Sequence, residues 1–210
     1  MNAMSGEAKI DGRALRRERN RTAVLDAAFE IFAEGHIEPS VERVADRAGV
    51  SNRSIYRYFE DRDHLEQAAV THAVEQILPE LHIVDLGLGT LQERIDRFVE
   101  HRLRIHQRYG AVIRAVRRAA ETQPAIAQEI EAAVLVGNAL FSENFARELA
   151  IVGPAERLKV SLGAQMPFRI ETVEFLWNAL GGEIEDVREV LTDHLVRVLE
   201  PLSGSVPISA

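Results

Sequence analysis

The stretch that decides the fold of this chain is residues 41–65, VERVADRAGVSNRSIYRYFEDRDHL. Apolar residues at positions 41, 44, 45 and 48 fall on one face of a helix with 3.6 residues per turn. Gly49 follows, and a glycine there lets the backbone end one helix and turn sharply. Ser51 is a favoured cap for a second helix from Asn52 to Phe59. The pattern therefore predicts two short helices joined by a three-residue turn.

The second helix would carry a polar outer face that contains no acidic residue. Ile55 and Phe59 lie on one side, which leaves six polar residues free: Asn52, Arg53, Ser54, Tyr56, Arg57 and Tyr58. Side chains of these types form hydrogen bonds with base edges and with phosphate oxygens. An ordinary solvated face is the alternative, but two exposed tyrosine rings gain little from contact with water. The pattern favours a helix that contacts DNA.

Residues 21–65 resemble the DNA-binding head of the tetracycline-repressor (TetR) family of transcriptional regulators. The residues that stand at the family's spacings are Ala28, Phe32, Gly35, Val44, Ala45, Ala48, Gly49, Val50, Ser51, Tyr56, Phe59 and Leu65. The chain departs from the family pattern at Arg53, where glycine is common, and at Arg62, where lysine is usual. The resemblance implies an all-α fold, in which a three-helix head with a helix-turn-helix precedes a larger helical effector-binding and dimerisation domain.

We expect four segments along the chain. They are a basic N-terminal arm at 1–19, a helix-turn-helix DNA-binding domain at 20–60, a helical effector-binding and dimerisation domain at 61–200, and a disordered tail at 201–210. The helices expected from periodicity and from glycine, proline and capping residues run from about 20 to 34, 61 to 78, 91 to 106, 110 to 120, 124 to 150, 168 to 180 and 183 to 200, with a further helix that begins at Pro154.

The net charge of −8 argues against a generally polycationic DNA-binding protein. Residues 66–210 carry 14 basic and 21 acidic side chains, against 11 and 12 in residues 1–65. However, residues 13–21, RALRRERNR, hold five arginines and one glutamate. Phosphate contact depends on the charge within a Debye length of about 8 Å. A solvated charged tail is the alternative for this run, but its position before the predicted head favours contact with phosphates or the minor groove.

The predicted DNA contacts are Arg17, Arg21, Ser40, Ser51, Asn52, Arg53, Ser54, Tyr56, Arg57, Tyr58 and Arg62. Arg53, Arg57 and Asn52 are the candidate base readers, because their side chains bond two acceptors or donors of one base. The resemblance assigns Tyr56 and Tyr58 to the DNA backbone. Ser40 and Arg62 stand at predicted helix starts, where free backbone N–H groups attract a phosphate.

The resemblance also implies a dimer interface in the last two helices. The apolar positions predicted for it are Ile170, Val173, Trp177, Leu180, Val187, Leu191, Leu195 and Val198. Packing of these stripes onto the chain's own core is the alternative that periodicity leaves open. A dimer would read an inverted-repeat operator in double-stranded DNA, with half-sites about 34–36 Å apart.

The middle helices are expected to enclose a pocket for a small-molecule effector. Large apolar side chains with a few polar groups are typical of such a pocket, and the candidates are Phe98, His101, Tyr109, Asn138, Phe141, Phe145 and Trp177. Plain core packing is the alternative for aromatic residues at helical spacing. The acidity of this part of the chain favours a neutral or cationic effector over a strongly anionic one.

Other classes of site find little support in the sequence. The chain has no cysteine, so disulfides and thiolate metal sites are excluded. His101 and His106 fall on different helix faces, and no nucleophile motif is present, so we expect no metal, no cofactor and no enzyme activity. The start of the chain lacks an apolar signal region, and the longest uncharged interior stretch, Ala132–Ser142, is shorter than the ~20 residues that span a bilayer. We expect a cytoplasmic protein.

The sequence therefore predicts a sequence-specific transcriptional regulator, a homodimeric repressor that a small-molecule effector releases from a palindromic operator. Two alternatives stay open. One is a ligand-independent DNA-binding or architectural protein with the same head. The other is a helical small-molecule carrier with a vestigial head.

Overall fold

The computed structural model describes residues 12–36 and 38–203, and every regular element within them is a helix. In chain order the helices are α1 (Gly12–Ala33), α2 (Val41–Ala48), α3 (Asn52–Tyr58), α4 (Arg62–Ile77), η1 (Leu78–Leu81), α5 (Leu91–Ala120), α6 (Pro124–Asn144), α7 (Ala146–Leu149), α8 (Pro154–Gln165), η2 (Met166–Phe168), α9 (Ile170–Ala179) and α10 (Ile184–Ser203). The all-α fold class predicted from the sequence is confirmed.

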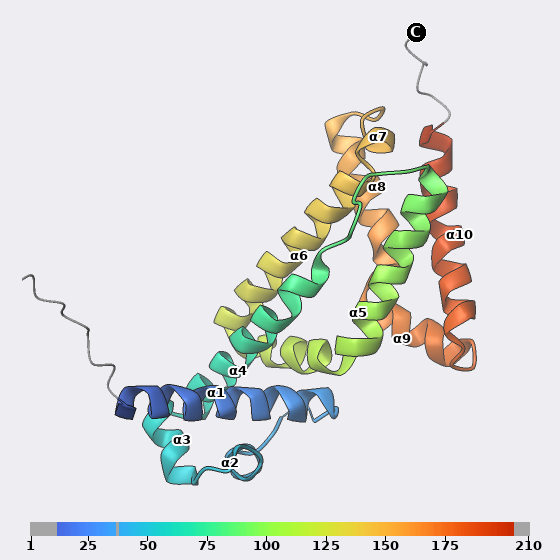
Figure 1. Ribbon diagram of the computed structural model, residues 1–210. Helices are drawn as coiled ribbons and strands as arrows, with labels where there is room; N and C mark the ends of the chain where they lie inside the picture. Colours follow the sequence, from blue (N-terminus) through green and yellow to red (C-terminus); the bar gives the residue numbers. More distant parts are fainter. Residues whose placement is uncertain (1–11, 37, 204–210) are drawn as a thin grey trace, which may run out of the picture.

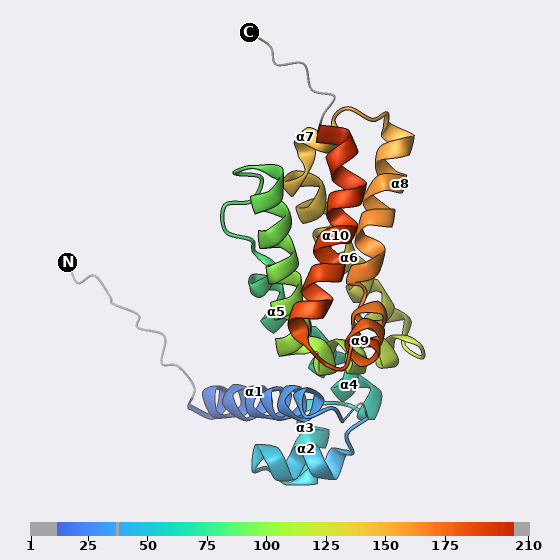
Figure 2. The ribbon, with the colours of Figure 1, turned by 90° about the vertical axis from the view of Figure 1, so that its right-hand side faces the viewer.

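The helices form a small head and a longer body. Figures 1 and 2 show α1, α2 and α3 together at one end of the molecule, and α5 to α10 extending away from them. Helix α4 connects the two parts, because it packs against α1 on the head side and against α5 and α6 on the body side. Helix α5 bends strongly along its length (Figure 1) and also packs against α1.

One hydrophobic core runs through the head and into the body. It contains Ile31 and Ile55 of the head, Val70 of α4, and Val112 and Ile126 of the body. All five side chains are 1% exposed or less. The boundary predicted at residue 60 therefore separates groups of helices but does not separate two cores.

The turn between α2 and α3 has the geometry that its sequence predicts. Gly49 adopts φ 65° and ψ 31°, in the left-handed region, and its N–H donates to the carbonyls of Ala45 and Asp46. The Oγ of Ser51 caps α3 by accepting a hydrogen bond from the N–H of Ser54 at 3.2 Å. A Cβ at position 49 would have no atom within 4 Å. The backbone angle, and not a lack of space, therefore requires glycine here.

Several predicted helix starts are confirmed. Asp61 caps α4, with its Oδ1 accepting the N–H of His64 at 2.8 Å. Pro124 and Pro154 occupy the first positions of α6 and α8, where the missing N–H has no consequence for the helix.

Other helix boundaries differ from the prediction. Helix α1 begins at Gly12 and not near residue 20, so residues 12–19 of the expected arm are helical, while residues 1–11 lie outside the described part of the chain. Helix α5 continues through Gly110, where a Cβ would stand 3.4 Å from Cδ1 of Ile170, so the glycine favours close packing over a break. Helix α10 extends to Ser203, beyond the predicted start of the tail.

The helix predicted at 124–150 is divided at Phe145. This residue has φ −115° and ψ 26°, outside the helical region, and separates α6 from α7. Its side chain is completely buried, with its ring centroid 4.9 Å from that of Phe141 and 5.7 Å from that of Phe98. Tertiary packing of the ring therefore accompanies a break that the local sequence does not signal.

A buried ion pair joins α5 to α7. Arg94 and Glu148 are 2% and 4% exposed, and their side chains form two hydrogen bonds, of 2.8 and 2.5 Å. Arg94 also donates to the carbonyl of Asn144 at 2.7 Å, and the Asn144 amide donates back to the carbonyl of Arg94 at 3.3 Å. The Asn144 side chain in turn accepts the N–H of Gly87 at 3.0 Å. The network ties the loop before α5 to the end of α6.

Helix α6 has the length and composition of a membrane-crossing helix, with a mean hydropathy of 1.2 over an 18-residue window. Only 11% of that window is buried within the chain, and Val134, Leu135 and Val136 are exposed. The helix nevertheless packs against α4, α5 and α8, and part of its apolar surface lines the cavity that is described below.

We predict opposite effects for alanine at two glycines. Gly49→Ala should lower the free energy of unfolding by about 1–2 kcal/mol, because alanine is strained in the left-handed region. Gly137→Ala, inside α6 with no atom within 4 Å of the added Cβ, should raise it by about 0.5–1 kcal/mol. Urea denaturation of both variants measures the difference, and equal effects at the two sites would contradict this account of the turn.

We also predict that Glu148→Gln lowers the free energy of unfolding by about 3–5 kcal/mol, because it leaves the charge of Arg94 buried without a counter-ion. The matched control is Glu18→Gln, which removes an exposed pair with Arg21 at 3.8 Å and should change stability by less than about 1 kcal/mol. Thermal and urea denaturation at one protein concentration test both. A loss at Glu148 no larger than at Glu18 would show that the buried network is dispensable.

Candidate nucleic-acid interface and body cavity

Helix α3 exposes four of the six polar residues that were predicted to face outward, while Ser54 and Tyr58 are partly buried. Asn52, Arg53, Tyr56 and Arg57 are all exposed, and Tyr56 leaves 55% of its surface uncovered. On the opposite side Ile55 is 1% exposed and belongs to the shared core. The helix is therefore anchored through its apolar side, and its polar side is open to a partner.

The two arginines on this face are not neutralised within the protein. Among the described residues, Arg53 and Arg57 take part in no ion pair, whereas Arg47 on α2 pairs with Glu30 at 3.2 Å and with Glu34 at 2.8 Å. Positive charge is therefore concentrated on the outward face of α3.

Tyr58 lies differently from Tyr56. It is partly buried, its ring packs against the core, and its hydroxyl accepts a hydrogen bond from Nδ2 of Asn20 at 3.3 Å. The hydroxyl keeps its own hydrogen for an acceptor outside the head. Asn20, which the sequence analysis did not select, thus holds the direction of this phenol group.

The arginine run 13–21 is part of the folded head and not an extended arm. It forms the first turns of α1. Nη2 of Arg17 donates to the carbonyl of Arg57 at 3.4 Å, and the guanidinium of Arg21 lies 5.6 Å from the ring centroid of Phe59. The run therefore places its positive charge beside α3, at a position fixed by the helix.

The four remaining predicted DNA-contact residues lie at the starts of α2, α3 and α4. The Oγ of Ser40 caps α2 by accepting the N–H of Arg43 at 3.2 Å. Ser51 and Ser54 join their hydroxyls at 2.9 Å in the first turn of α3. Arg62 is exposed at the first position of α4. The serine hydroxyls already form hydrogen bonds within the helix ends. The free backbone N–H groups of the helix starts, together with the side chain of Arg62, are therefore the groups that could bind an anion.

The body contains a cavity of about 290 Å³ next to α4. Its apolar walls include Val74 and Ile77 of α4, Ile113 and Val116 of α5, and Ile130 of α6. Val74, Ile77, Val116 and Ile130 also pack in or against the core that joins the head to the body. A molecule in this cavity would therefore touch the side chains that hold the head in place.

Two nitrogen-bearing side chains enter the cavity from successive turns of α5. They are Arg102 and His106, and the Nε of Arg102 and the Nδ1 of His106 are both buried without a hydrogen-bond partner. The other ring nitrogen of His106 lies 2.9 Å from the carbonyl of Phe168, which accepts only, so Nε2 carries the hydrogen. Burial, followed by the charge of Arg102, lowers the pKa of His106 to about 4. The ring is therefore neutral near pH 7.

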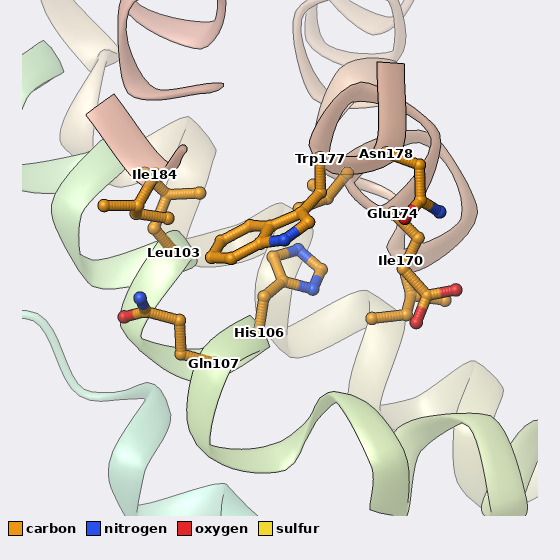
Figure 3. A pocket seen from close by; sticks show the side chains of 9 residues that line it. Leu103, His106, Gln107, Ile170, Glu174, Trp177, Asn178 and Ile184 are labelled. Carbon is orange, nitrogen blue, oxygen red and sulfur yellow. The ribbon is translucent and has the colours of Figure 1, made fainter. Parts of the chain in front are cut away.

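A second pocket, of about 400 Å³, adjoins the first at His106 and Ile170. Figure 3 shows the indole of Trp177 reaching across it above His106, with Glu174 and Asn178 to one side. Its walls come from α5, α9 and the start of α10 only. Because it does not reach α4, its occupation would not bear directly on the head.

The residues predicted for the effector pocket are divided by the structure. Asn138 lines the cavity and Trp177 lines the adjoining pocket. The other five belong to the core and are at most 6% exposed: Phe98, His101, Tyr109, Phe141 and Phe145. The ring of Phe98 packs edge-to-face against three other phenylalanines, at centroid distances of 5.3–5.7 Å. These five side chains line neither of the two pockets and pack in the hydrophobic core or beside it.

Arg102 and His106 were missed by sequence reasoning, although a signal was present. Apolar residues at 95, 99, 113 and 116 form a stripe along α5, and Arg102 and His106 stand at the positions where this stripe should continue. A charged residue within an apolar stripe marks a buried polar group that needs a partner.

The residues predicted for the dimer interface also need correction. Five of the eight are at most 5% exposed within the single chain: Ile170, Val173, Val187, Leu191 and Leu195. A side chain without exposed surface has no area to offer to a second copy. Trp177, Leu180 and Val198 remain partly exposed. The large apolar side chains that α8, α9 and α10 do expose include Leu158, Phe175 and Val190, at 62%, 68% and 40%.

Comparison with known proteins gives similar folds and related sequences. The solved structure of a tetR-family transcriptional regulator from Streptomyces coelicolor has a TM-score of 0.68 and 20% identity, and covers 90% of this chain and 83% of that one. A putative TetR-family regulator from Mesorhizobium loti has a TM-score of 0.59 and 15% identity, with 90% and 97% covered. These two likenesses concern the fold alone.

Two curated relatives come from Mycolicibacterium smegmatis. The HTH-type transcriptional repressor KstR is 31% identical over 118 residues, which are 56% of this chain and 57% of that protein. The HTH-type transcriptional repressor LfrR is 31% identical over 87 residues, which are 41% and 46% of the two chains. The chain thus spans about half the length of the curated relatives that it matches.

The family profile described as "Bacterial regulatory proteins, tetR family" matches residues 24–69. That segment runs from the middle of α1, through α2 and α3, into α4, and so contains the helix-turn-helix and its exposed polar face. Residues 24–69 thus match the tetR family of bacterial regulatory proteins.

Proposed function

We propose that this chain is a sequence-specific DNA-binding regulator of transcription that acts as a homodimer. The observation that carries the proposal is the outward face of α3, where Asn52, Arg53, Tyr56 and Arg57 are exposed and the two arginines have no ion pair in the described part of the chain. In this proposal α1–α3 form the DNA-binding head, and the later helices form the effector-binding and dimerisation body.

The head would make two kinds of contact with DNA, one to base edges and one to phosphates. Arg53, Arg57 and Asn52 read base edges in the major groove, since a guanidinium bonds both acceptors of guanine and an amide pairs with adenine. Tyr56 and Tyr58 donate to phosphate oxygens, and the hydrogen bond from Asn20 holds Tyr58 ready for this role. Phosphates also meet the predicted contacts Arg17, Arg21, Ser40, Ser51, Ser54 and Arg62, which position the head without reading sequence.

The second copy would pack against α8, α9 and α10. Leu158 and Phe175 expose more than half of their surface, and Val190 exposes 40%. Apolar side chains at these exposures gain free energy when a partner covers them. A single head reads few base pairs, so a twin set about one DNA turn away would supply the remaining contacts.

A small molecule in the 290 Å³ cavity would regulate DNA binding through α4. The cavity walls include Val74 and Ile77 of α4, and α4 packs directly on α1. A ligand that binds one orientation of α4 more tightly shifts the heads toward that orientation, and so changes the affinity for an operator. Two relatives are named transcriptional repressors, which supports repression that the ligand relieves.

Two other functions are less well supported. A ligand-independent DNA-binding protein would have no need of a cavity behind α4 with buried nitrogens that lack partners. A small-molecule carrier would have no need of the unpaired arginines on α3. The cavity and the α3 face together favour ligand-responsive regulation.

The direct test is selection of binding sites from random DNA duplexes with the purified chain. We expect enrichment of an inverted repeat whose half-sites lie about one helical turn apart, and an affinity that falls steeply as salt rises. The absence of any enriched sequence at low salt, with the protein folded by circular dichroism, would refute the proposed function.

We predict distinct effects for two substitutions on α3. Arg57→Ala should weaken binding to the selected operator by about 1–3 kcal/mol and relax base preference at one position of each half-site. Tyr58→Phe should weaken all sequences alike, because only a phosphate contact is lost. Fluorescence anisotropy with a panel of single-base operator variants separates the two. Unchanged affinity in both variants would contradict the assignment of α3.

We predict that Phe175→Arg dissociates the dimer, because it places a charge within the proposed apolar interface. The matched control is Val84→Arg, since Val84 is 67% exposed in a loop before α5, and should leave the assembly unchanged. Sedimentation velocity over a range of concentrations gives the result. Equal mass for Phe175→Arg and the parent protein would place the interface elsewhere.

A further inference from the structure

Arg102 is a cation for which the described part of the chain supplies no counter-ion. No hydrogen bond or ion pair of its guanidinium group occurs there, and Nε is buried without a partner. Desolvation lowers the pKa of Arg102, and no acidic neighbour raises it. Yet arginine stays protonated in proteins, so an uncompensated positive charge faces the cavity.

The ionisable side chains of the cavity lining are all basic. Arg117 and Arg169 also line it, and no aspartate or glutamate does. Both of these arginines are held by Glu171, outside the lining. That leaves Arg102 as the arginine of the lining whose charge remains without a partner. Arg117 and Arg169 share this one carboxylate, so with the neighbouring His106 neutral near pH 7 the site offers two net positive charges, one of them on the unpartnered Arg102.

An isolated charge beside apolar walls is unfavourable unless something pairs with it. Arg94, earlier on the same helix, shows the structural solution, since Glu148 neutralises it with two hydrogen bonds. Among residues 12–36 and 38–203, no acidic side chain plays this part for Arg102. A bound anion would provide the missing partner, and a guanidinium matches a carboxylate with two parallel hydrogen bonds.

Most of the remaining lining is apolar, with Asn138 and Gln165 as uncharged polar side chains, and the cavity opens between α6 and α8. Val74, Ile77 and Ile113 line its interior. Val134 of α6 and Leu162 of α8 also line it and are about half exposed, at 49% and 51%. The volume of about 290 Å³ lies at the lower end of the range for small-molecule sites. It suits a modest apolar group that extends toward this opening.

We propose that the cavity binds an amphipathic carboxylic acid, whose carboxylate pairs with Arg102 and whose apolar part packs against α4, α5 and α6. The proposal deepens the proposed function, since it names the class of effector for the same cavity. It also reverses the expectation, drawn from the acidity of the body, of a neutral or cationic effector. The total charge of residues 66–210 does not describe the lining, because most of its acidic side chains lie elsewhere on the surface.

The test compares three probes with the same ten-carbon chain: decanoate, decan-1-ol and decylamine. Isothermal titration calorimetry gives their affinities, and the fluorescence of Trp177, the single tryptophan, reports on the pocket adjoining His106. We expect decanoate to bind about tenfold or more tightly than the alcohol, and the amine to bind most weakly. Equal affinity of acid and alcohol would overturn the proposal.

A pair of variants assigns the effect to Arg102. Arg102→Met keeps much of the side-chain length and should abolish the preference for the acid over the alcohol, whereas Arg102→Lys should keep part of it. Arg104→Met, at an exposed position of the same helix, should leave the preference for the acid unchanged.

In the absence of ligand, Arg102→Met should raise the melting temperature, because it removes an unpaired charge. A lower melting temperature, with the preference intact, would show a structural role instead.

The outcome is independent of DNA binding. Binding of decanoate that depends on Arg102 supports the inference even if site selection yields no operator, in which case the proposed function alone fails. An operator found by selection, combined with no preference for the acid, overturns the inference and leaves the regulator intact. Release of a found operator by decanoate, lost in Arg102→Met, would support both.

Discussion

The structure depends on the double packing of α4. Its apolar residues face α1 of the head on one side and α5 and α6 of the body on the other. The resulting core is continuous from Ile31 and Ile55 to Val112 and Ile126. Close-packed side chains transmit displacements because the interior has few voids to absorb them. The shared core therefore couples the head to the body, and in the proposed function α4 is the element through which the cavity would act on α3.

Two arginines of α5, Arg94 and Arg102, contrast a charge that is paired within the fold with one that is not. Arg94 and Arg102 lie about two turns apart on α5, and each points a charged group into the body, so both would be expected to have a partner within the fold. Arg94 has Glu148 and the carbonyl of Asn144, and its network closes the far end of the body. Arg102 faces a cavity without a counter-ion. A residue that reduces stability in the empty protein is typical of a binding site, where the free energy of ligand binding offsets its cost.

Local sequence rules predict the helix-turn-helix and most helix starts. Gly49, Ser51 and Asp61 were correctly assigned, because a left-handed turn and a capping oxygen depend on residues within four positions of each other. The division at Phe145 and the continuity of α5 through Gly110 could not be read in this way, since packing of residues far away in the chain decides them.

The predictions of the dimer interface and of the effector pocket were less successful, because they too depend on packing between residues far apart in the chain. Periodicity correctly identifies Leu191 and Leu195 as apolar-face residues, but the same stripe fits a core and a dimer interface equally well. The aromatic residues expected to form the pocket, Phe98 and Phe141 among them, pack against one another instead. The pocket was better marked by what does not belong in an apolar stripe, namely Arg102. A polar exception to a periodic pattern is more informative about a binding site than the pattern itself, because burial of a charge needs a reason.

Charge distribution reconciles an acidic chain with a DNA-binding head. At physiological salt, charges more than about 8 Å from a phosphate are largely screened, so the acidic surface of the body has little effect on a head that extends beyond it (Figure 1). Within that distance the relevant groups are the first turns of α1 and the exposed face of α3, joined by the contact between Arg17 and Arg57. The same reasoning applies inside the body, where the cavity is basic although the domain is acidic. Local charge at each site, and not the sum over the chain, therefore determines which ligand each site accepts.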